Sequence, residues 1–489
     1  MIISRYRQYV PLLLGLLLVL LMPLEGLCSG LHDEAATLGT KLGVLWILPF
    51  VCMLLSIAIG PLAKPEFWHH NFGKVAVFWG LAFLVPFAFA YGFSQAMYQF
   101  VHAMLLEYVP FIILLFSLFT VAGGIRLTGS LVGSPKVNIG ILLVGTLLAS
   151  WMGTTGAAML LIRPLLRANA HRKYRVHSVV FFIFLVANIG GSLTPLGDPP
   201  LFLGFLQGVD FFWTTAHLFK LTVTVSAILL VLYFLLDSIL FRMEGKPVPP
   251  CADSGEKLGL EGKINFLLLL GIVLSVLLSG VWKSTTTFHV YEVELELQNI
   301  VRDILLLIIA WLSLKWTSAK SRELNGFSWG PIAEVAKLFL GIFLSMIPAL
   351  AILKAGNSGA LSSIINLVST DGQANNATFF WLTGALSSFL DNAPTYLVFF
   401  NTAGGIPVPP LEAKAVAGHL MTEMAPTLTA ISAGAVFMGA NTYIGNAPNF
   451  MVRSIAEESG VKMPSFFGYM LWSICILIPC FILLTRWYF

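Results

Sequence analysis

A carboxylate, an amide and a proline interrupt the apolar stretch from Thr378 to Phe400. They are Asp391, Asn392 and Pro394. A charged side chain at the bilayer centre costs at least ~2.5–3.5 kcal/mol on insertion scales, so an acid kept at that depth indicates a functional site. Proline breaks the helix beside it, and freed backbone groups at membrane depth are tolerated only inside protein or along a watery cavity. The stretch therefore predicts a re-entrant hairpin whose tip binds an ion.

A second aspartate lies in another interrupted stretch, from Ser178 to Leu206. Asp198 stands directly before two prolines and among further helix-breaking residues. Because each proline removes a backbone donor and clashes with the preceding turn, this stretch should form two half-helices instead of one continuous span. The prolines suit the first turn of the second half-helix, with Asp198 at its cap position. A purely structural capping role remains an alternative for Asp198 and for Asp391.

Charge distribution predicts another hairpin earlier in the chain. The apolar stretch Val137–Ile162 follows Arg126 and Lys136 and precedes five cations between positions 163 and 175. Basic loops stay on the cytoplasmic side of a membrane, so both ends of the stretch should face the cytoplasm. We expect the stretch to enter the membrane and return, with its turn at residues 153–156.

An internal repeat connects these features. At one constant offset, four residues of the first half, Gly191, Thr194, Gly197 and Pro200, fall on Gly439, Thr442, Gly445 and Pro448 of the second. At this offset of 248, Asp198 falls on Asn446. At a second offset of 238, which brings residues 150–152 onto 388–390, Gly153 falls on Asp391. Each half therefore supplies one carboxylate, from a different element. Because the first hairpin should open inward and the second outward, the repeats have inverted topology, which is typical of secondary transporters with a midplane site.

The predicted ion site combines oxygen-bearing side chains from both halves. Its members are Asp391, Asp198, Asn392, Thr154, Thr155, Thr194, Thr442 and Asn446, and the structural breaks are Gly153, Gly156, Pro195, Gly197, Pro199, Pro394, Gly445 and Pro448. Sodium prefers hard oxygen ligands, and an acid in low dielectric holds a proton more readily, so one carboxylate could alternate between the two cations. A structural role remains the alternative for Thr154 and Thr155, as packing residues between helices, and for Asn392 and Asn446, as turn residues. Transported Na⁺ and H⁺ are expected, and no cofactor.

Composition places the chain among polytopic membrane proteins. Of its 489 residues 57% are hydrophobic and 11% charged, and the mean hydropathy is +0.86. These values lie far outside those of soluble domains. The basic residues stand in short loops, so they report topology and indicate a lipid bilayer as partner, not nucleic acid. The predicted fold is an all-α polytopic membrane protein of two inverted-topology repeats, each with a re-entrant hairpin and a discontinuous transmembrane helix, with about ten full spans in total.

The chain divides into four predicted parts. Residues 1–30 are a signal peptide or N-terminal anchor, 42–241 the first repeat half, 242–263 a cytoplasmic linker and 264–489 the second half. Residues 92–101 are expected to form an external loop, and the acidic segment Glu292–Glu296 a surface strand or loop. Four charged residues near predicted span ends are expected at the membrane interface, namely Glu107, Asp237, Lys337 and Glu423.

Four motifs carry a family resemblance. The runs Ala149–Gly156, Ser192–Pro200, Leu390–Tyr396 and Gly445–Asn449 resemble those of NhaD-type sodium:proton antiporters and, more broadly, the citrate-transporter-like branch of the ion transporter superfamily. The resemblance covers most of residues 42–484. It implies two hairpins and two broken helices around a scaffold, with the chain as a multi-pass protein of a bacterial inner membrane and a homodimer as the expected assembly.

Three candidate functions are compatible with two aspartates inside the membrane. The first is exchange of Na⁺ or Li⁺ for H⁺ through the shared midplane carboxylate site. The alternative is a Na⁺- or H⁺-coupled transporter of citrate, another carboxylate or an inorganic anion, but the four motifs hold two acids and no Lys or Arg, which favours a cation. An intramembrane aspartyl protease also has two membrane aspartates. Leu390, not a tyrosine, precedes Asp391, and an inverted repeat serves no purpose in a protease, so a transporter and not an enzyme is expected.

Overall fold

The computed structural model confirms an all-α membrane fold. It describes residues 37–129, 131–247, 259–370, 373–406 and 413–489. Within these ranges ten helices are long and apolar enough to cross a membrane. The predicted signal or anchor at residues 1–30 lies outside the described residues, as do positions 248–258 of the predicted linker.

The elements follow one another in similar order in the two halves. The first half contains η1 (Val44–Ile47), α4 (Leu48–Ala63), α5 (Pro65–Tyr91), α6 (Phe93–His102), the π-helical turn η2 (Ala103–Tyr108), α7 (Val109–Ala122), β1 (Arg126–Thr128), α8 (Pro135–Met152), α9 (Thr154–Ala168), α10 (Val176–Leu185), η3 (Ile189–Leu193), α11 (Pro199–Leu206) and α12 (Trp213–Met243). The second contains β2 (Gly259–Glu261), α13 (Ile264–Val281), β3 (Thr287–Val290), β4 (Val293–Glu296), α14 (Leu297–Trp316), α15 (Ala319–Leu324), α16 (Gly330–Lys354), η4 (Gly356–Ser358), α17 (Ser362–Val368), β5 (Ser369–Thr370), β6 (Gln373–Ala374), α18 (Asn376–Phe389), α19 (Asn392–Gly404), α20 (Ala413–Thr422), α21 (Ala425–Met438), η5 (Gly439–Asn441), α22 (Ala447–Glu458) and α23 (Phe466–Tyr488).

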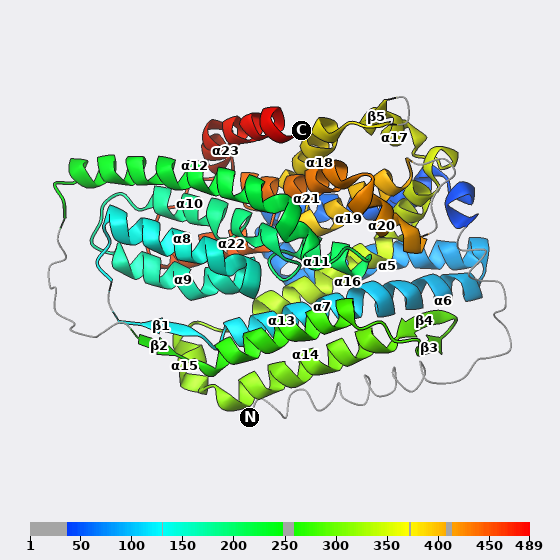
Figure 1. Cartoon of the computed structure of the whole chain (residues 1–489), viewed down its shortest axis with the longest axis horizontal. Helices are drawn as coiled ribbons and strands as arrows, with labels where there is room; N and C mark the ends of the chain where they lie inside the picture. Colours follow the sequence, from blue (N-terminus) through cyan, green and yellow to red (C-terminus); the bar gives the residue numbers. More distant parts are fainter. Residues whose placement is uncertain (1–36, 130, 248–258, 371–372, 407–412) are drawn as a thin grey trace.

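Both halves contain a helical hairpin. In the first, α8 and α9 pack together and are separated by Gly153, whose φ of 80° turns the chain in a conformation that side chains rarely adopt. In the second, α18 and α19 pack together around a break at Leu390 and Asp391. Figure 1 shows α8 and α9 extending toward the end of the molecule that carries β1, β2 and α15, whereas α18–α20 lie toward the end with β3 and β4. These opposite directions agree with the predicted inverted repeat.

Both halves also contain a broken span. The first runs through α10, η3 and α11, and the second through α21, η5 and α22. Each second half-helix begins with a proline in its first two positions, because the missing proline N–H needs no partner there. These breaks lie where the sequence predicted them.

The predicted external loop at residues 92–101 is wrong. The structure continues from α6 through η2 into α7, so that Phe93–Ala122 forms one apolar helical span. Gly92, with φ of 92°, separates this span from α5, and the chain then meets no further glycine or proline before Pro110. Because no helix breaker interrupts this stretch, the helix continues where a loop was expected.

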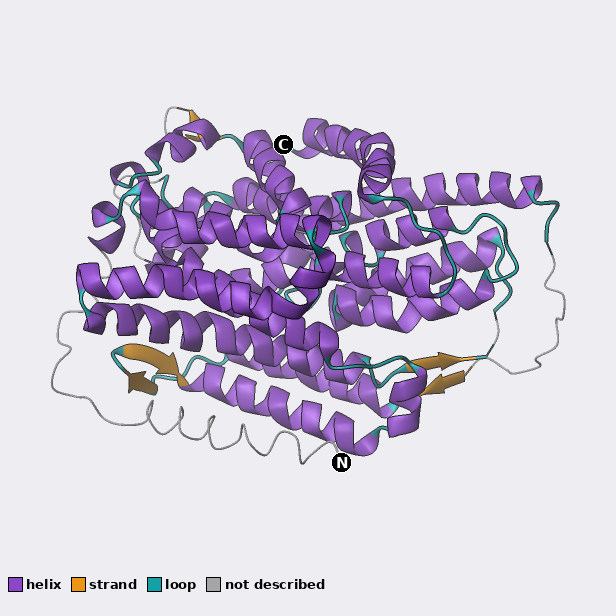
Figure 2. Cartoon of the chain, turned by 180° about the vertical axis from the view of Figure 1, so that it is seen from behind, coloured by secondary structure: helices purple, strands orange, loops and turns teal. Residues whose placement is uncertain are grey.

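Short antiparallel pairs of strands lie beside the helices. β3 pairs with β4, which confirms that the acidic segment around Glu292 is surface strand and turn. β1 pairs with β2 and so joins a loop of the first half to the start of the second. Figure 2 shows these two strand pairs at opposite ends of the helical body.

Candidate functional site

Asp198 is the centre of a buried polar cluster. Asp198 is 1% exposed, and its carboxylate accepts three hydrogen bonds from neutral groups. The Thr154 hydroxyl and the Asn446 amide each donate to Oδ1 at 3.0 Å, and the Asn392 amide donates to Oδ2 at 2.5 Å. The donors lie at the starts of α9, α22 and α19. Both hairpins and both broken spans therefore meet at this one carboxylate.

The two predicted aspartates differ in their local roles. Asp198 occupies the cap position of α11, but its side chain makes no capping hydrogen bond to that helix. Asp391 does cap its helix, because its Oδ1 accepts the Ala393 N–H at 3.1 Å. It is half-buried, and Asn392 follows it directly. The capping alternative thus describes Asp391 and does not describe Asp198.

No cation neutralises either aspartate within the described residues. None of the ion pairs in that part of the chain includes Asp198 or Asp391. Asp391 directly precedes Asn392, whose amide contacts Asp198, so the two acids belong to the same site. Charges of one sign repel more strongly in a low-dielectric interior than in water. The site therefore favours a bound proton or a metal cation.

Asn392 offers an oxygen beside Asp198. Its Nδ2 donates to the carboxylate, so its Oδ1 faces elsewhere, and that buried oxygen has no hydrogen-bond partner in the described part of the chain. A buried acceptor without a partner costs free energy unless a ligand satisfies it. An amide oxygen is a hard donor of the kind that Na⁺ binds. The Thr155 hydroxyl, half-buried at the other hairpin, makes no hydrogen bond to described residues either.

Thr194 and Thr442 do not reach Asp198. Each buried hydroxyl donates instead to the last turn of the first helix in the hairpin of its half, Thr194 to the Ser150 carbonyl of α8 and Thr442 to the Ser388 carbonyl of α18. The same hydroxyls accept backbone N–H groups two residues later, both at 3.2 Å. These equivalent hydrogen bonds connect each broken span to the hairpin of its half. They agree with the predicted repeat and show that both threonines stabilise the local structure.

Two glycines in each half allow the unwound backbone to cross itself. A Cβ at Gly197 would lie 2.1 Å from the Gly191 carbonyl oxygen, and one at Gly445 would lie 2.6 Å from that of Gly439. No side chain fits such an approach. The Gly197 carbonyl also accepts the Thr154 N–H at 2.8 Å, which holds the hairpin tip against the break.

The other predicted break residues lie at or beside helix ends. Pro195 belongs to the non-helical segment before α11, Pro199 begins α11, and Pro394 and Pro448 stand in the first turns of α19 and α22. Gly156 lies in the first turn of α9, where a Cβ would come within 2.7 Å of Ala122 Cβ. This glycine therefore permits close packing of α9 on α7.

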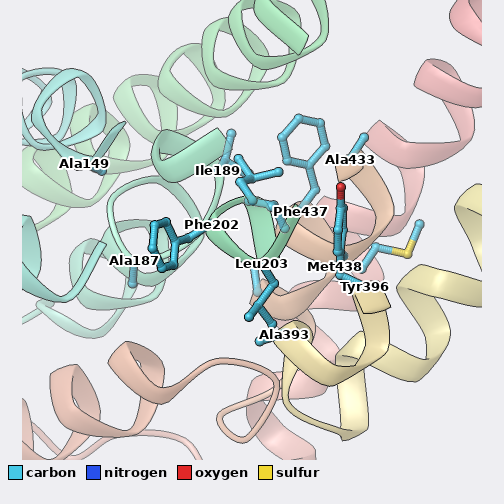
Figure 3. Close-up of a cluster of buried hydrophobic side chains, with 14 of the residues drawn as sticks. Ala149, Ala187, Ile189, Phe202, Leu203, Ala393, Tyr396, Ala433, Phe437 and Met438 are labelled. Atoms are coloured by element: carbon cyan, nitrogen blue, oxygen red, sulfur yellow. The ribbon is translucent and has the colours of Figure 1, made fainter. Parts of the chain in front are cut away.

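Buried apolar side chains of both halves pack together beside the two broken spans. Figure 3 shows Ile189 and Leu203 of the first half together with Ala393, Tyr396 and Phe437 of the second. All five are buried. Asp198 is itself 1% exposed and so lies in a low-dielectric interior, which strengthens its electrostatic interactions.

Two acids expected at the membrane interface are buried, so those predictions are wrong. Asp237 accepts Arg172 at 2.6 Å, His177 at 2.8 Å and Asn138 at 3.0 Å, which compensates its charge. Glu107 lies in the π-helical turn η2 and is 8% exposed. Sequence position alone could not find the partners of Asp237, because they come from α8, α10 and the loop before α10.

One comparison with known proteins identifies the family. Residues 39–489 match the CitMHS_2 family, whose description is "Putative citrate transport". No curated protein matches the chain. The match supports the citrate-transporter-like part of the resemblance and does not distinguish NhaD-type antiporters. Because the match spans nearly the whole sequence, the chain belongs to this family of membrane transporters.

Proposed function

We propose that the protein exchanges Na⁺ or Li⁺ for H⁺ across a bacterial inner membrane, with Asp198 as the shared binding group. The observation that carries the proposal is the burial of Asp198 among neutral donors, with no cationic partner in the described residues. A buried carboxylate without a counter-ion must bind a proton or a cation to avoid a large desolvation penalty. Because both ligands need the same oxygens, they exclude one another.

The neighbours of Asp198 can supply the remaining ligands. Asn392 contributes the unpartnered Oδ1, and Asp391 contributes a second, half-buried carboxylate next to it. The cation would therefore lie on the second-hairpin side of Asp198. Binding from that side leaves the hydrogen bond from Thr154 in place.

Competition at one carboxylate then couples the two fluxes. When Asp198 carries a proton, its charge is gone and the attraction for Na⁺ falls. When Na⁺ is bound, protonation becomes unfavourable. A carrier that moves between its two membrane faces only with the site occupied exchanges one cation for the other. The contribution of both halves to the site suits such alternating access.

Coupled transport of citrate or another carboxylate is the second candidate. The family description favours it, and so do four helices that begin at the site, since helix N-termini attract anions. Two acids would repel a bare carboxylate substrate. Uptake of an anion through this site would therefore need a co-bound cation.

Vesicles that hold an acid gradient distinguish the two functions. A pH-sensitive dye reports proton efflux when Na⁺, Li⁺, K⁺ or citrate is added to inside-out vesicles. We expect Na⁺ or Li⁺ to release protons and citrate to have no effect, with the response lost in Asp198→Asn. Sodium-dependent accumulation of labelled citrate, without proton release by Na⁺ alone, would replace the exchange proposal with the second candidate.

A further inference from the structure

Arg163, in α9 of the first hairpin, is a cation without an ion pair in the part of the chain that the structure describes. Its Nη1 is buried and has no hydrogen-bond partner. α22 packs against α9 and ends at Glu458, but no ion pair joins this acid to Arg163. A buried donor without a partner costs free energy unless a ligand satisfies it. The guanidinium is therefore open to an anion from outside the chain.

Gly326 holds this guanidinium at the protein surface. The glycine lies in the turn between α15 and α16, and a Cβ on it would come within 2.2 Å of Arg163 Nη2. Its φ of 68° also belongs to the left-handed region, so glycine suits this position on two grounds. Gly326 is exposed and Arg163 is half-buried. The contact between α9 and the turn therefore reaches the surface of the molecule.

A second guanidinium lies at the same turn. Arg322 is buried, and its Cζ lies 5.1 Å from the centre of the Phe327 ring. Its hydrogen bonds in the described ranges go to uncharged oxygens, namely the Thr120 carbonyl at 2.6 Å, the Ser313 carbonyl at 3.0 Å and the Ser313 hydroxyl at 2.7 Å. α16 begins at Gly330, so the positive end of a 25-residue helix adds to the two cations. The turn thus carries positive charge that no ion pair among the described residues compensates.

Partly buried apolar side chains lie beside this turn. Phe119, Met159 and Ile332 form a small cluster apart from the main core, and its partly buried members are Leu115, Phe116, Phe327, Trp329 and Met451. We call these five the apolar rim. Tryptophan is enriched at the depth of the lipid headgroups. Figure 1 shows α9 and α15 toward the end with β1 and β2, where Arg126 and Lys320 indicate the cytoplasmic face. The rim is therefore an apolar surface on the cytoplasmic side.

We propose that Arg163 binds the phosphate of an anionic phospholipid of the cytoplasmic leaflet, whose chains lie along the apolar rim. The planar guanidinium suits phosphate because it can donate two parallel hydrogen bonds to it. The positive charge at the turn favours a headgroup of net negative charge. The rim favours a lipid over free phosphate, since only a lipid has chains to bury there. The site is separate from Asp198, and the proposal holds whichever solute the protein carries.

Lipid binding to the purified full-length protein tests the proposal. Native mass spectrometry of delipidated protein in an uncharged detergent measures the binding of dioleoyl phosphatidylglycerol, and the melting temperature reports its effect. We expect the lipid to bind wild type and raise its melting temperature, and Arg163→Gln to bind it about 10-fold more weakly. Without lipid, Arg163→Gln should melt no lower than wild type, since Nη1 has no hydrogen bond to lose. The matched control is Arg242→Gln, which removes an exposed cation from the end of α12 and should bind like wild type.

Two further probes separate the parts of the lipid. Dioleoylglycerol has the same chains without a phosphate, and sodium phosphate has no chains, so neither should reproduce the rise in melting temperature. Should Arg163→Gln not purify as a monodisperse species, Arg163→Lys replaces it. The lysine keeps the charge but loses the planar fork, so binding should still weaken. Wild-type binding in the folded Arg163 variant, equal binding of dioleoylglycerol, or the full rise with inorganic phosphate alone overturns the proposal.

Discussion

The Asn392 amide of the second hairpin lies 2.5 Å from Asp198 Oδ2 in the first broken span. The two residues are 194 positions apart in the sequence, so the contact exists only because the two halves pack around a common centre. It also fixes the direction of the amide and leaves its buried Oδ1 without a hydrogen-bond partner in the described part of the chain. One hydrogen bond thus satisfies the carboxylate and leaves an amide oxygen unpaired beside it.

Replacement of Asp198 by asparagine should abolish cation-dependent proton release. The amide cannot alternate between a proton and a metal cation, and it would meet the Thr154, Asn392 and Asn446 donors with only one acceptor. Dye-loaded vesicles measure the loss. Asp210→Asn, at an exposed aspartate just beyond α11, is the matched control and should exchange normally. Exchange at the wild-type rate in Asp198→Asn would remove this residue from the mechanism.

Replacement of Asn392 by alanine should weaken Na⁺ binding about 10- to 100-fold. Hydrogen bonds to charged groups contribute ~1.5–3 kcal/mol, and the variant also loses the unpartnered oxygen. The half-saturating Na⁺ concentration for proton release gives the measurement. Thr402→Ala on the same helix removes a hydroxyl that bonds the Val398 carbonyl, and it should leave that concentration within a factor of two or so. Equal effects of the two substitutions would contradict the role of Asn392.

A methyl group at Gly197 should disrupt the first break. The added Cβ would lie 2.1 Å from the Gly191 carbonyl oxygen, so the crossing must open and release the Thr154 N–H from Gly197. We expect Gly197→Ala to lower both the yield of folded protein and the rate of exchange. Gly140→Ala adds the same methyl in α8, where no heavy atom lies within 4 Å, and should be neutral or slightly stabilising. Melting temperatures in detergent and vesicle assays together distinguish these outcomes.

Asp237→Asn should destabilise the protein without altering its choice of cation. Loss of one partner from a buried ion pair costs ~3–5 kcal/mol because Arg172 would remain charged in the interior. A large drop in melting temperature is expected. The control is Glu261→Gln, which removes an exposed partner of Arg126 and should cost at most ~1 kcal/mol. If Asp237→Asn has the same melting temperature as the wild type, the buried cluster around Asp237 does not stabilise the fold.

The pair at Glu261 should also show a small dependence on acid. The Ser321 hydroxyl and then the Arg126 guanidinium hold the pKa of Glu261 below its usual range. A lowered folded-state pKa gives stability that is present above the ordinary pKa of glutamate and is lost as the pH falls through the folded-state pKa. The difference in melting temperature between wild type and Glu261→Gln should therefore vanish in acid. A difference that grows as the pH falls would contradict the assignment.

The sequence predicted the breaks better than it predicted the contacts. Glycine, proline and charged residues affect the backbone close to their own position. Nearby residues in the sequence therefore predicted the hairpin turns at Gly153 and Asp391 and the unwound segment before Asp198. The constant spacing of matching residues then predicted the repeat. The roles of the two acids could not be separated in this way, because both stand at helix starts and only the packed structure shows that Asp391 caps its helix while Asp198 does not.

Other errors have the same physical origin. Asp237 stands near a span end in the sequence, but residues from three other segments cover it in the fold. Asn446 contacts Asn188, whose amide in turn contacts Asn449, and nothing in their spacing shows that these amides meet. Spacing also could not show that the hydroxyls of Thr194 and Thr442 donate to carbonyls of the neighbouring hairpins, and their part in the ion site stays a prediction.

Asp198 and Asn446 occupy matching positions in the two halves, so the carboxylate of this pair belongs to the first half alone. Under the proposed exchange, the inward-facing and outward-facing states would therefore not be equivalent, because the charge of this pair stays with the first half in both.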